Sequence, residues 1–399
     1  MTTIPTSAAR TAEFISLSHL NPSTELEPIP TRGIDVPYFR RFVGALEDGG
    51  YDYTLLPYGS NSADSFVVAA AVGQLTEHIK PIVALRPNTT HPLVGAQKLA
   101  TLDQLTEGRA VVHLISGGSD AEQARHGDYL TKDQRYSRTS EYLDLLRRAW
   151  REPAPFSHDG EHYRFDEFGP GFSPYGDTIP ISIGGSSDEA FRVGGEKADI
   201  FSFWGEPLAD IRSQIERVHD IARAAGRTTL PRIWVTFRPI IAETEELAWQ
   251  KAFDHVTKIE RTYQSGAFQL GRSQGAPQNV GSQRLLDFAA KGDVYDRALW
   301  TRTAAATNAG GASTALVGTP ETVAAAILDY IDLGADLISI RGYDTLVDAV
   351  DYGQHVIPLV RQELAHREAT GSRGPLQDQH PGALAPGFDA AALASAGAR

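Results

Sequence analysis

Eight short runs rich in β-branched and aromatic residues recur along the chain, separated by stretches with helical apolar spacing. Such alternation of strands and helices is typical of βαβ units around a parallel sheet. Eight units favour a closed barrel over an open sheet. We therefore predict an α/β fold, a (β/α)₈ TIM barrel with strands at Glu13–Leu17, Tyr53–Pro57, Pro81–Leu85, Ala110–Ile115, Pro180–Ile183, Ile200–Trp204, Ile233–Ile241 and Asp336–Ile340.

The stretches between these runs repeat apolar residues with a period of 3.6, which predicts amphipathic helices. Glycines such as Gly49, Gly50, Gly108 and Gly334 stand where helices should end, because glycine readily adopts the left-handed conformation of a helix C-terminus. The predicted helices are Val36–Leu46, Ala63–Leu75, Pro92–Leu105, Arg138–Trp150, Pro207–Ala225 and Pro320–Leu333.

Three segments interrupt this alternation. Residues 153–175 predict a hairpin or long loop before the fifth strand, with a turn at Asp159-Gly160. Residues 258–313 are polar and rich in Gly, Gln and Asn, and a loop of that length predicts a lid after strand seven. Residues 369–399 are rich in Gly, Pro and Ala and predict an extension from the barrel. We expect one barrel domain over residues 1–368.

Composition excludes several classes of function. A formal net charge of −13 argues against a nucleic-acid binder, because that affinity depends on Lys and Arg neutralising phosphates. The absence of cysteine excludes disulfides, thiolate metal sites and cysteine nucleophiles. The first residues are polar, and the longest apolar run, Phe66 to Val72, is too short to span a bilayer. We therefore expect a cytoplasmic protein without a membrane partner.

In a (β/α)₈ barrel the active site forms at the C-terminal ends of the strands. The fifth strand ends in the sequence ISIGGSSDEA, in which Gly184 and Gly185 leave the strand and Ser186 and Ser187 open a helix. Backbone N–H groups at such a helix start, joined by serine hydroxyls, suit a phosphate. The same sequence also suits an ordinary turn with a serine N-cap, and both interpretations stay open.

Other strand ends carry side chains with two interpretations each. His19 and His113 are catalytic candidates or satisfied core histidines, and Trp204 either floors a ligand pocket or fills the core. The arginines Arg86, Arg238 and Arg341 suit anionic partners or structural ion pairs. We find no HExxH cluster and no GxSxG elbow, so neither a metal site nor a serine hydrolase is expected.

Longer motifs carry a resemblance to a known family. The segment VALRPNTTHPLVGAQKLATLDQLTEGRAVVHLISGGS resembles FMNH₂-dependent alkanesulfonate monooxygenases of the luciferase-like superfamily, and further matches follow in DQRYSRTSEYLDLLRRAW, IPISIGGSSDEA, DIFSFWGEP, GGASTALVGTPETVAAAILDYIDLGAD and ISIRGY. The resemblance runs from about Phe14 to Val360. It implies FMN as the cofactor, supplied as FMNH₂ by a separate NAD(P)H:flavin reductase, with O₂ as co-substrate, and it implies a homodimer or homotetramer.

The resemblance also assigns site residues. It places the FMN phosphate at Tyr136, Gly185, Ser186 and Ser187, and it places His113, where the nearest relatives tend to have Asn, near the ribityl chain or the ring system. Ser62 stands where many of these enzymes have cysteine. His19, Tyr343 and Trp204 match family active-site residues.

Strand seven and the lid depart from the family pattern. Thr236 and Arg238 replace an Arg-x-His pair, and Asn308 and Ala309 stand where a lid arginine is expected. Arg238 is therefore the candidate that takes over one cationic role, and Arg302 the candidate for the lid charge.

The family chemistry gives the first functional hypothesis. It is the oxygenative cleavage of the C–S bond of an organosulfonate, which releases sulfite and an aldehyde or other carbonyl product. Arg238 would stabilise negative charge, and Tyr343 or His19 would handle protons. Two alternatives remain: the same chemistry on a sulfosugar, sulfone, amine or alkane, and a flavin-binding protein without catalysis. A deazaflavin in place of FMN also stays open.

Overall fold

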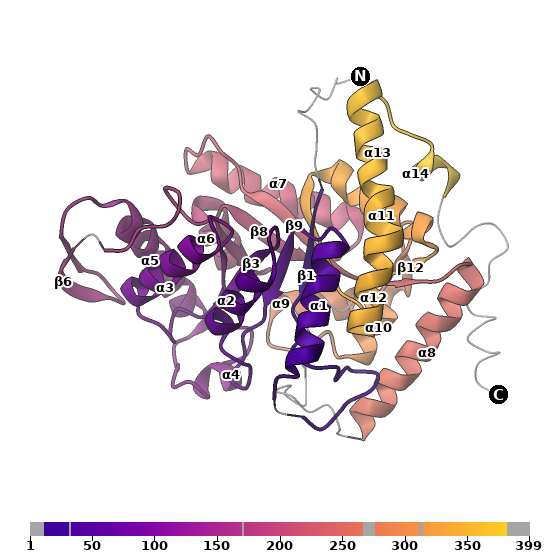
Figure 1. Cartoon of the computed structure of the whole chain (residues 1–399), viewed down its shortest axis with the longest axis horizontal. Coiled ribbons are helices and arrows are strands. Elements are labelled where there is room, and N and C mark those ends of the chain that lie inside the picture. The colour runs from indigo at the N-terminus through magenta and orange to yellow at the C-terminus, as the bar shows by residue number, and fades with distance from the viewer. Residues whose placement is uncertain (1–11, 32, 170, 266–275, 311–313, 381–399) are drawn as a thin grey trace.

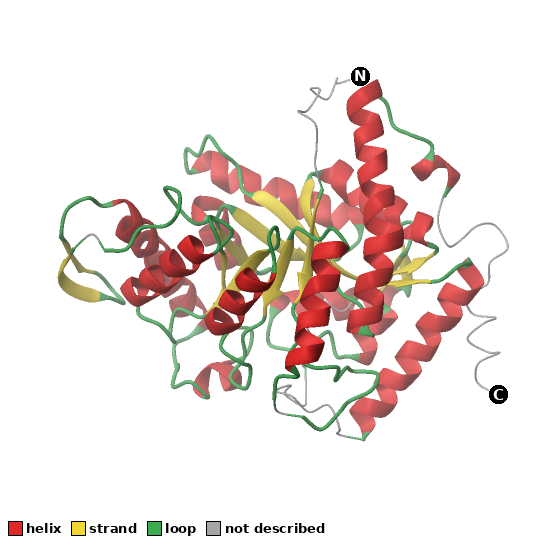
Figure 2. Ribbon diagram, in the orientation of Figure 1, coloured by secondary structure: helices red, strands yellow, loops and turns green. Residues whose placement is uncertain are grey.

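The computed structural model describes residues 12–31, 33–169, 171–265, 276–310 and 314–380. Eight parallel strands form its centre, and the pairing of β13 with β1 closes them into a ring. The strands follow one another around the ring in chain order, which confirms the predicted (β/α)₈ barrel (Figure 2). They are β1 (Glu13–Leu17), β2 (Tyr53–Leu56), β3 (Lys80–Leu85), β4 (Val111–Leu114), β7 (Ile181–Gly184), β8 (Ile200–Trp204), β9 (Arg232–Ile241) and β13 (Ala335–Ile340).

Helices surround the strand ring (Figure 1). The main helices between successive barrel strands are α1 (Val36–Asp48), α2 (Ser65–Leu75), α3 (Pro92–Leu105), α5 (Lys132–Arg151), α6 (Asp188–Lys197), α7 (Leu208–Ala224), α8 (Glu245–Gln264) and, directly before β13, α11 (Pro320–Leu333). Shorter or later helices are α4 (Asp120–Ala124), α9 (Val280–Lys291), α10 (Arg302–Ala306), α12 (Thr345–Asp351), α13 (Ile357–Thr370) and α14 (Leu376–Gln379). None of the helices in the described residues is long and apolar enough to cross a membrane.

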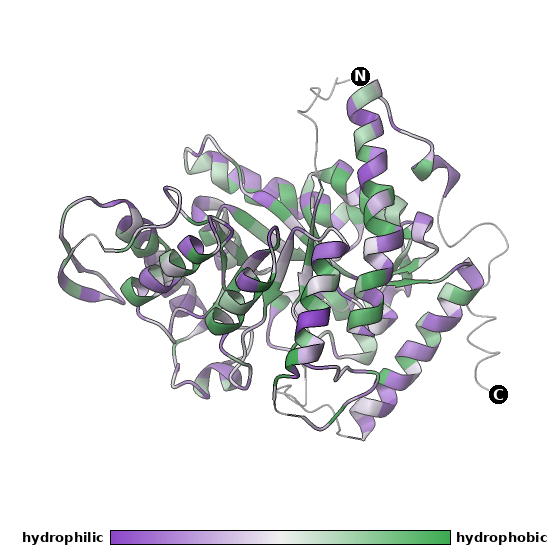
Figure 3. Cartoon of the chain, viewed as in Figure 1, coloured by the Kyte–Doolittle hydropathy of each residue, from purple (hydrophilic) through white to green (hydrophobic). Residues whose placement is uncertain are grey.

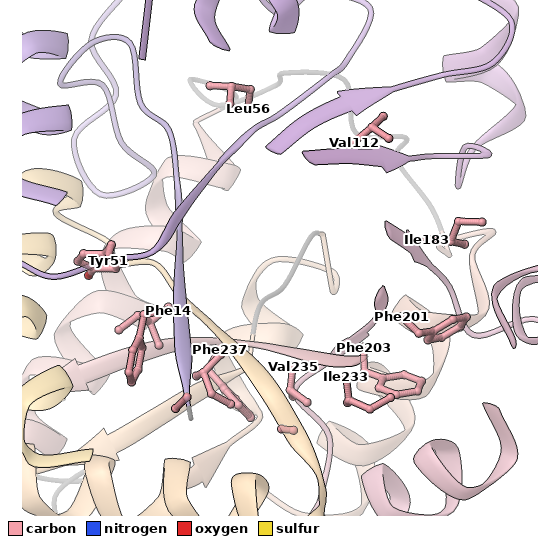
Figure 4. Packing of buried hydrophobic residues seen from close by; sticks show 14 of the residues in the cluster. Phe14, Tyr51, Leu56, Val112, Ile183, Phe201, Phe203, Ile233, Val235 and Phe237 are labelled. Carbon is pink, nitrogen blue, oxygen red and sulfur yellow. The ribbon is translucent and has the colours of Figure 1, made fainter. Parts of the chain in front are cut away.

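The alternation of side chains along each strand divides the core into two layers. Outward-facing residues pack between strands and helices, and Figure 4 shows Phe14, Val112, Ile183 and Phe201 in this layer. Figure 3 shows apolar residues concentrated on the strands and on the helix faces that cover them. The inner layer, which fills the barrel, is Ile15, Tyr53, Ile82, Val111, Ile200, Trp234 and Leu337. The barrel is thus plugged below its C-terminal mouth, where the strand ends remain free to form a site.

Helix α5 begins at Lys132, earlier than the predicted start at Arg138. Its N-terminus has a complete capping box, in which Thr131 and Gln134 satisfy each other's backbone N–H groups. This polar first turn lacks the apolar spacing on which the prediction depended. The extra turns matter because they carry Lys132 and Tyr136 to the barrel mouth.

The predicted insertion after strand seven is present and lies against the barrel mouth, but its described part contains helices and a hairpin where we predicted a loop. Helix α8 continues to Gln264, and α9 is followed by a hairpin of β10 (Val294–Tyr295) and β11 (Leu299–Trp300). This hairpin adds β12 (Ala315–Gly318) to the outer half of β9. Polar composition suggested a loop, whereas apolar residues such as Leu285 bury one face of α9. Residues 266–275 and 311–313 of this predicted loop lie outside the described part of the chain.

The hairpin predicted within residues 153–175 is confirmed. Strands β5 (Phe156–Asp159) and β6 (Arg164–Phe168) pair in antiparallel fashion. The tail does not extend freely over its described part, because Gln377 donates to Asp329 of α11 at 2.6 Å and Arg373 pairs with Asp332 at 2.6 Å. These polar contacts hold residues 371–380 against the barrel, and residues 381–399 lie outside the described part.

Candidate active site

A cavity of about 400 Å³ opens at the C-terminal ends of the barrel strands. Its cationic lining residues are Arg86, Lys132 and Arg341, and none of the described residues that line it is acidic. This local charge opposes the net charge of the chain, which is −13. A concave site with three cations and no lining carboxylate is suited to an anionic ligand.

One corner of the cavity is formed by the turn between β7 and α6. Gly185 has a φ of +147°, a conformation that disfavours other residues, and a Cβ there would lie 2.6 Å from Oη of Tyr136. Ser187 caps α6 by accepting from the N–H of Ala190. Tyr136 is buried, and this burial raises its pKa although a hydrogen bond with Ser187 acts in the opposite direction. The phenol is therefore a neutral hydrogen-bonding group beside the helix N-terminus.

The N-terminus of α9 lies against the same corner of the cavity. Asn279, Val280 and Gly281 line the cavity, and a Cβ on Gly281 would lie 3.2 Å from Oγ of Ser186. Asn279 also caps α9 by accepting from Ser282 N at 2.7 Å. The N-termini of α6 and α9, each with a partial positive charge, therefore lie against the same space. Lys132 lines that cavity as well, and burial lowers its pKa.

The floor of the cavity comes from inward-facing strand residues. His113 of β4 bonds to Oγ of Ser182 at 2.9 Å through Nδ1, and its ring lies 5.3 Å from the Trp234 ring. Burial lowers the pKa of His113 to about 4, so the imidazole is neutral at pH 7. Trp204, at the end of β8, lines the wall. The floor is thus aromatic and uncharged.

A second cluster of predicted site residues lies beside the cavity and does not line it. Arg238 donates to Oε2 of Glu25 at 2.6 Å, and its guanidinium lies 3.6 Å from the centroid of the Tyr343 ring. Arg238 lies outside the cavity because β9 changes its partner strand at this point. It pairs with β13 as far as Phe237 and with β12 from Arg238 onward. Arg238 therefore lies where the strand leaves the barrel.

His19 belongs to the same cluster. Burial lowers its pKa to about 3, with a further contribution from the positive charges of Arg341 and Arg238. Burial also raises the pKa of Tyr343. His19 and Tyr343 are therefore both neutral at pH 7. Arg341 lies between the cluster and the cavity, since it lines both the main cavity and the small void beside His19.

The structure therefore brings together most of the predicted cofactor residues: His113, Tyr136, Gly185, Ser186 and Ser187, with Trp204, line one cavity. His19, Arg238 and Tyr343 form the adjacent buried cluster. Ser62 does not join either group. It is exposed in the loop after β2, where its hydroxyl donates to Gly59 O at 3.0 Å.

Sequence reasoning missed Lys132, Asn279 and Gly281 as cavity residues. Lys132 follows the capping threonine of α5, so the T-x-x-Q signal at Thr131 could have placed it at a helix N-terminus. Asn279 before an apolar run is likewise an N-cap signal. No local signal predicts that α9 folds back over the barrel mouth.

A model of the luciferase-like monooxygenase family matches residues 14–337. Among solved structures, a riboflavin lyase with modified FMN and riboflavin has 19% identity, a TM-score of 0.71, and coverage of 97% of this chain and 99% of that chain. DmoA from Hyphomicrobium sulfonivorans has 19% identity, a TM-score of 0.69, and coverage of 97% and 96%. The EDTA monooxygenase of Chelativorans sp. BNC1 has 21% identity, a TM-score of 0.67, and coverage of 88% and 93%. At these identities the similar structures establish the fold alone, whereas the family model spans most of the sequence: the chain belongs to the luciferase-like monooxygenase family.

Proposed function

We propose that the protein is a two-component monooxygenase that uses reduced FMN and O₂. The observation that carries this proposal is the corner of the cavity where Ser186, Ser187 and Tyr136 lie at the N-termini of α6 and α9, in a cavity that Lys132 also lines. Its cavity of about 400 Å³ lies in the range of roughly 300–1,000 Å³ of small-molecule and cofactor sites. The residues present therefore fit FMN, with its phosphate at this corner.

Reduced FMN, when bound, supplies two electrons and reacts with O₂. The chain's own residues would bind and orient it and keep the site dry. Trp204 and Trp234 supply apolar surface to the cavity, and the N-terminus of α9 lies beside Ser186, which would limit the access of water to the bound flavin. His113 is a neutral hydrogen-bonding group at the floor. Among proton-handling groups, His19 and Tyr343 remain our candidates.

The choice of FMN over a deazaflavin rests on the family model, which is that of a monooxygenase. Parallel titration of the protein with FMN and with F420 tests the choice: we expect tighter binding of FMN.

For the substrate we propose a small organosulfonate. The cationic cavity, without a lining carboxylate, supports an anion of this kind. The balanced reaction converts RCH₂SO₃⁻, FMNH₂ and O₂ into RCHO, HSO₃⁻, FMN and H₂O, with one oxygen atom in the aldehyde and the other in water. An NAD(P)H:flavin reductase would supply FMNH₂. The alternative substrates are sulfosugars, sulfones, amines and alkanes.

Sulfite release tests the substrate proposal. The protein is mixed with FMN, NADH, a flavin reductase and O₂, and with short-alkyl, long-alkyl, aromatic or sugar-derived sulfonates. Sulfite from one class is the expected result, and a Ser186→Ala/Ser187→Ala variant should release much less at limiting FMN. Tight binding of FMNH₂ without sulfite from any sulfonate would instead move the proposal to an alternative substrate. If the protein bound no flavin, the proposed flavin-dependent function itself would be contradicted.

We also propose that the chain self-associates through α2 and α3. Helix α2, SFVVAAAVGQL, is apolar on nearly all sides, which is unusual for a helix with one face in water. Val67 and Leu105 are 70% and 55% exposed, and they line a surface groove between the two helices. A Val67→Glu variant should dissociate the wild-type oligomer in sedimentation or light-scattering measurements. A wild-type protein that is monomeric would contradict the proposal.

A further inference from the structure

Arg86 is a buried cation at the end of β3 that lines the cavity and is only 5% exposed. Its Nη2 donates to Oε1 of Glu122 at 2.9 Å. Its Nε and Nη1 have no hydrogen-bond partner among the residues that the structure describes. A buried donor without a partner is energetically costly, so such donors on a side chain that lines a cavity point to an acceptor supplied by a ligand.

Glu122 is not a dedicated counter-ion for Arg86. Its carboxylate also accepts from the backbone N–H of Ser60 at 2.7 Å, from the Ser60 hydroxyl at 3.0 Å and from Arg125 at 2.7 Å. Burial acts to raise the pKa of Glu122, but the hydrogen bonds from Ser60 and Arg86 hold it below its ordinary value. One negative charge is therefore shared between two guanidinium groups, and the cavity side of Arg86 keeps positive charge.

The position of Arg86 separates it from the phosphate corner. Arg86 follows β3, whereas Ser186 and Ser187 follow β7, and β4 lies between the two strands in the barrel. Arg86 contacts Tyr58, whose ring centroid is 5.2 Å from the guanidinium, and it shares Glu122 with Ser60; Tyr58 and Ser60 both follow β2, on the side of β3 away from β7. The single phosphate of the cofactor thus has its own corner, and Arg86 faces the cavity from a different strand end.

We propose that Arg86 binds the anionic group of the substrate, a sulfonate or carboxylate oxygen, through Nε and Nη1. This inference rests on the proposed function, because it assumes that FMN occupies the corner at Ser186 and Ser187. Guanidinium groups form strong charge-assisted hydrogen bonds with oxyanions. Arg86 would then select anionic over neutral substrates, while Glu122 and Ser60 hold its side chain in place.

The experiment uses protein saturated with oxidised FMN and measures binding of 1-butanesulfonate, butyrate and neutral 1-butanol by calorimetry at constant ionic strength. Arg86→Met removes the charge and keeps an extended side chain, and Arg86→Lys keeps the charge with different donors. The matched control is Arg125→Ala, because Arg125 pairs with the same carboxylate but has a 45% exposed side chain and does not line the cavity. The affinity for FMN is measured for every variant.

We expect Arg86→Met to weaken binding of at least one anionic probe about tenfold or more, with FMN affinity and 1-butanol binding unchanged. Arg86→Lys should fall between wild type and Arg86→Met, which also covers the case in which Arg86→Met does not fold. Arg125→Ala should match the wild type.

Loss of FMN affinity with intact anion binding would overturn the inference, as would equal losses in Arg86→Met and Arg125→Ala. A wild type that binds FMN but neither anion would also overturn it and leave the flavin assignment intact, whereas failure to bind FMN would defeat the proposed function itself.

Discussion

Glu25 accepts a 2.6 Å hydrogen bond from Nη1 of Arg238, and both side chains are buried. Glu25 lies in the segment between β1 and α1, and Arg238 lies where β9 leaves the barrel, so the pair ties that segment to the barrel mouth. Arg238 also stacks on Tyr343. Arg238, which we predicted from the sequence to be a catalytic group, therefore already has a counter-ion in Glu25.

Breaking this pair by Glu25→Gln should destabilise the protein by about 3–5 kcal/mol, because a buried guanidinium is left without its counter-charge. The double variant Glu25→Leu/Arg238→Met should recover most of that loss. Unfolding in guanidinium chloride measures the free energy of unfolding of the single and the double variant. Asp220→Asn, in an exposed pair with Arg223, is the control and should change stability by roughly 0–1 kcal/mol. Equal stability of Glu25→Gln and the wild type would show that the pair carries no such role.

The same double variant tests the predicted catalytic role of Arg238. If the arginine only anchors the segment after β1, turnover should survive in the double variant. If Arg238 stabilises charge during the reaction, kcat should fall strongly while the protein stays folded. Steady-state kinetics with the substrate found by the sulfite assay distinguishes the two outcomes.

Acid should destabilise the protein through two half-buried histidines, His113 and His19. The pKa values of His113 and His19 fall from an ordinary value of 6.5 to about 4 and about 3. The unfolded chain then binds more protons than the folded chain below pH 6.5, so stability is present above that pH and is lost as the pH falls toward 4. Each group contributes a slope of about 1.4 kcal/mol per pH unit within its window.

Replacing His113 by Asn should therefore flatten the fall of Tm between pH 6.5 and 4. The matched control is His78→Asn, which removes an exposed histidine. Thermal unfolding followed by circular dichroism across this range provides the measurement. An unchanged slope in His113→Asn would mean that His113 keeps an ordinary pKa in the folded protein.

Gly185→Ala should damage both folding and the phosphate corner. The new Cβ would lie 2.6 Å from Oη of Tyr136 and 2.7 Å from Cβ of Ala190, at a φ of +147°. Gly226 also has a positive φ, +77°, but a Cβ there meets nothing within 4 Å. Gly226→Ala is thus a matched control for backbone strain alone, with an expected loss of about 1–2 kcal/mol. Only Gly185→Ala should also lose FMN affinity, as measured by fluorescence titration, and equal FMN affinity in the two variants would contradict the assignment.

Arg284 of α9 fastens the helix over the site through Glu206, which follows β8 and is 1% exposed. Burial raises the pKa of Glu206, although its bond with Arg284 acts against this shift. Arg284→Gln should loosen α9, weaken FMN binding and increase the fraction of NADH oxidised without product. Asp287→Asn, an exposed change on the same helix, serves as the control. Unchanged coupling in Arg284→Gln would separate α9 from the chemistry.

The barrel could be predicted because its signal is local. The strands are runs rich in β-branched and aromatic residues that are largely buried, as Ile181–Gly184 and Ile200–Trp204 are, and the connecting helices repeat with a period of 3.6. The serines and glycines after Ile183 were recognisable for the same reason. Their chemistry depends on a turn a few residues long.

Other features depend on partners far along the chain. The counter-ion of Arg238 stands 213 residues away, and nothing near Glu25 indicates that pairing. The cover that Asn279 and Gly281 provide requires α9 to fold back beside Ser186. Long-range packing decides such contacts, and one sequence carries no periodic signal for them.

The most direct test of the flavin assignment compares binding of FMN with binding of riboflavin. The wild type should bind FMN much more tightly than riboflavin, because only FMN has a phosphate for the corner at Ser186 and Ser187. In a Ser186→Ala/Ser187→Ala variant this preference should shrink, through weaker FMN binding at unchanged riboflavin affinity. Equal affinity of the wild type for FMN and riboflavin, or a preference that survives the double substitution, would contradict the account.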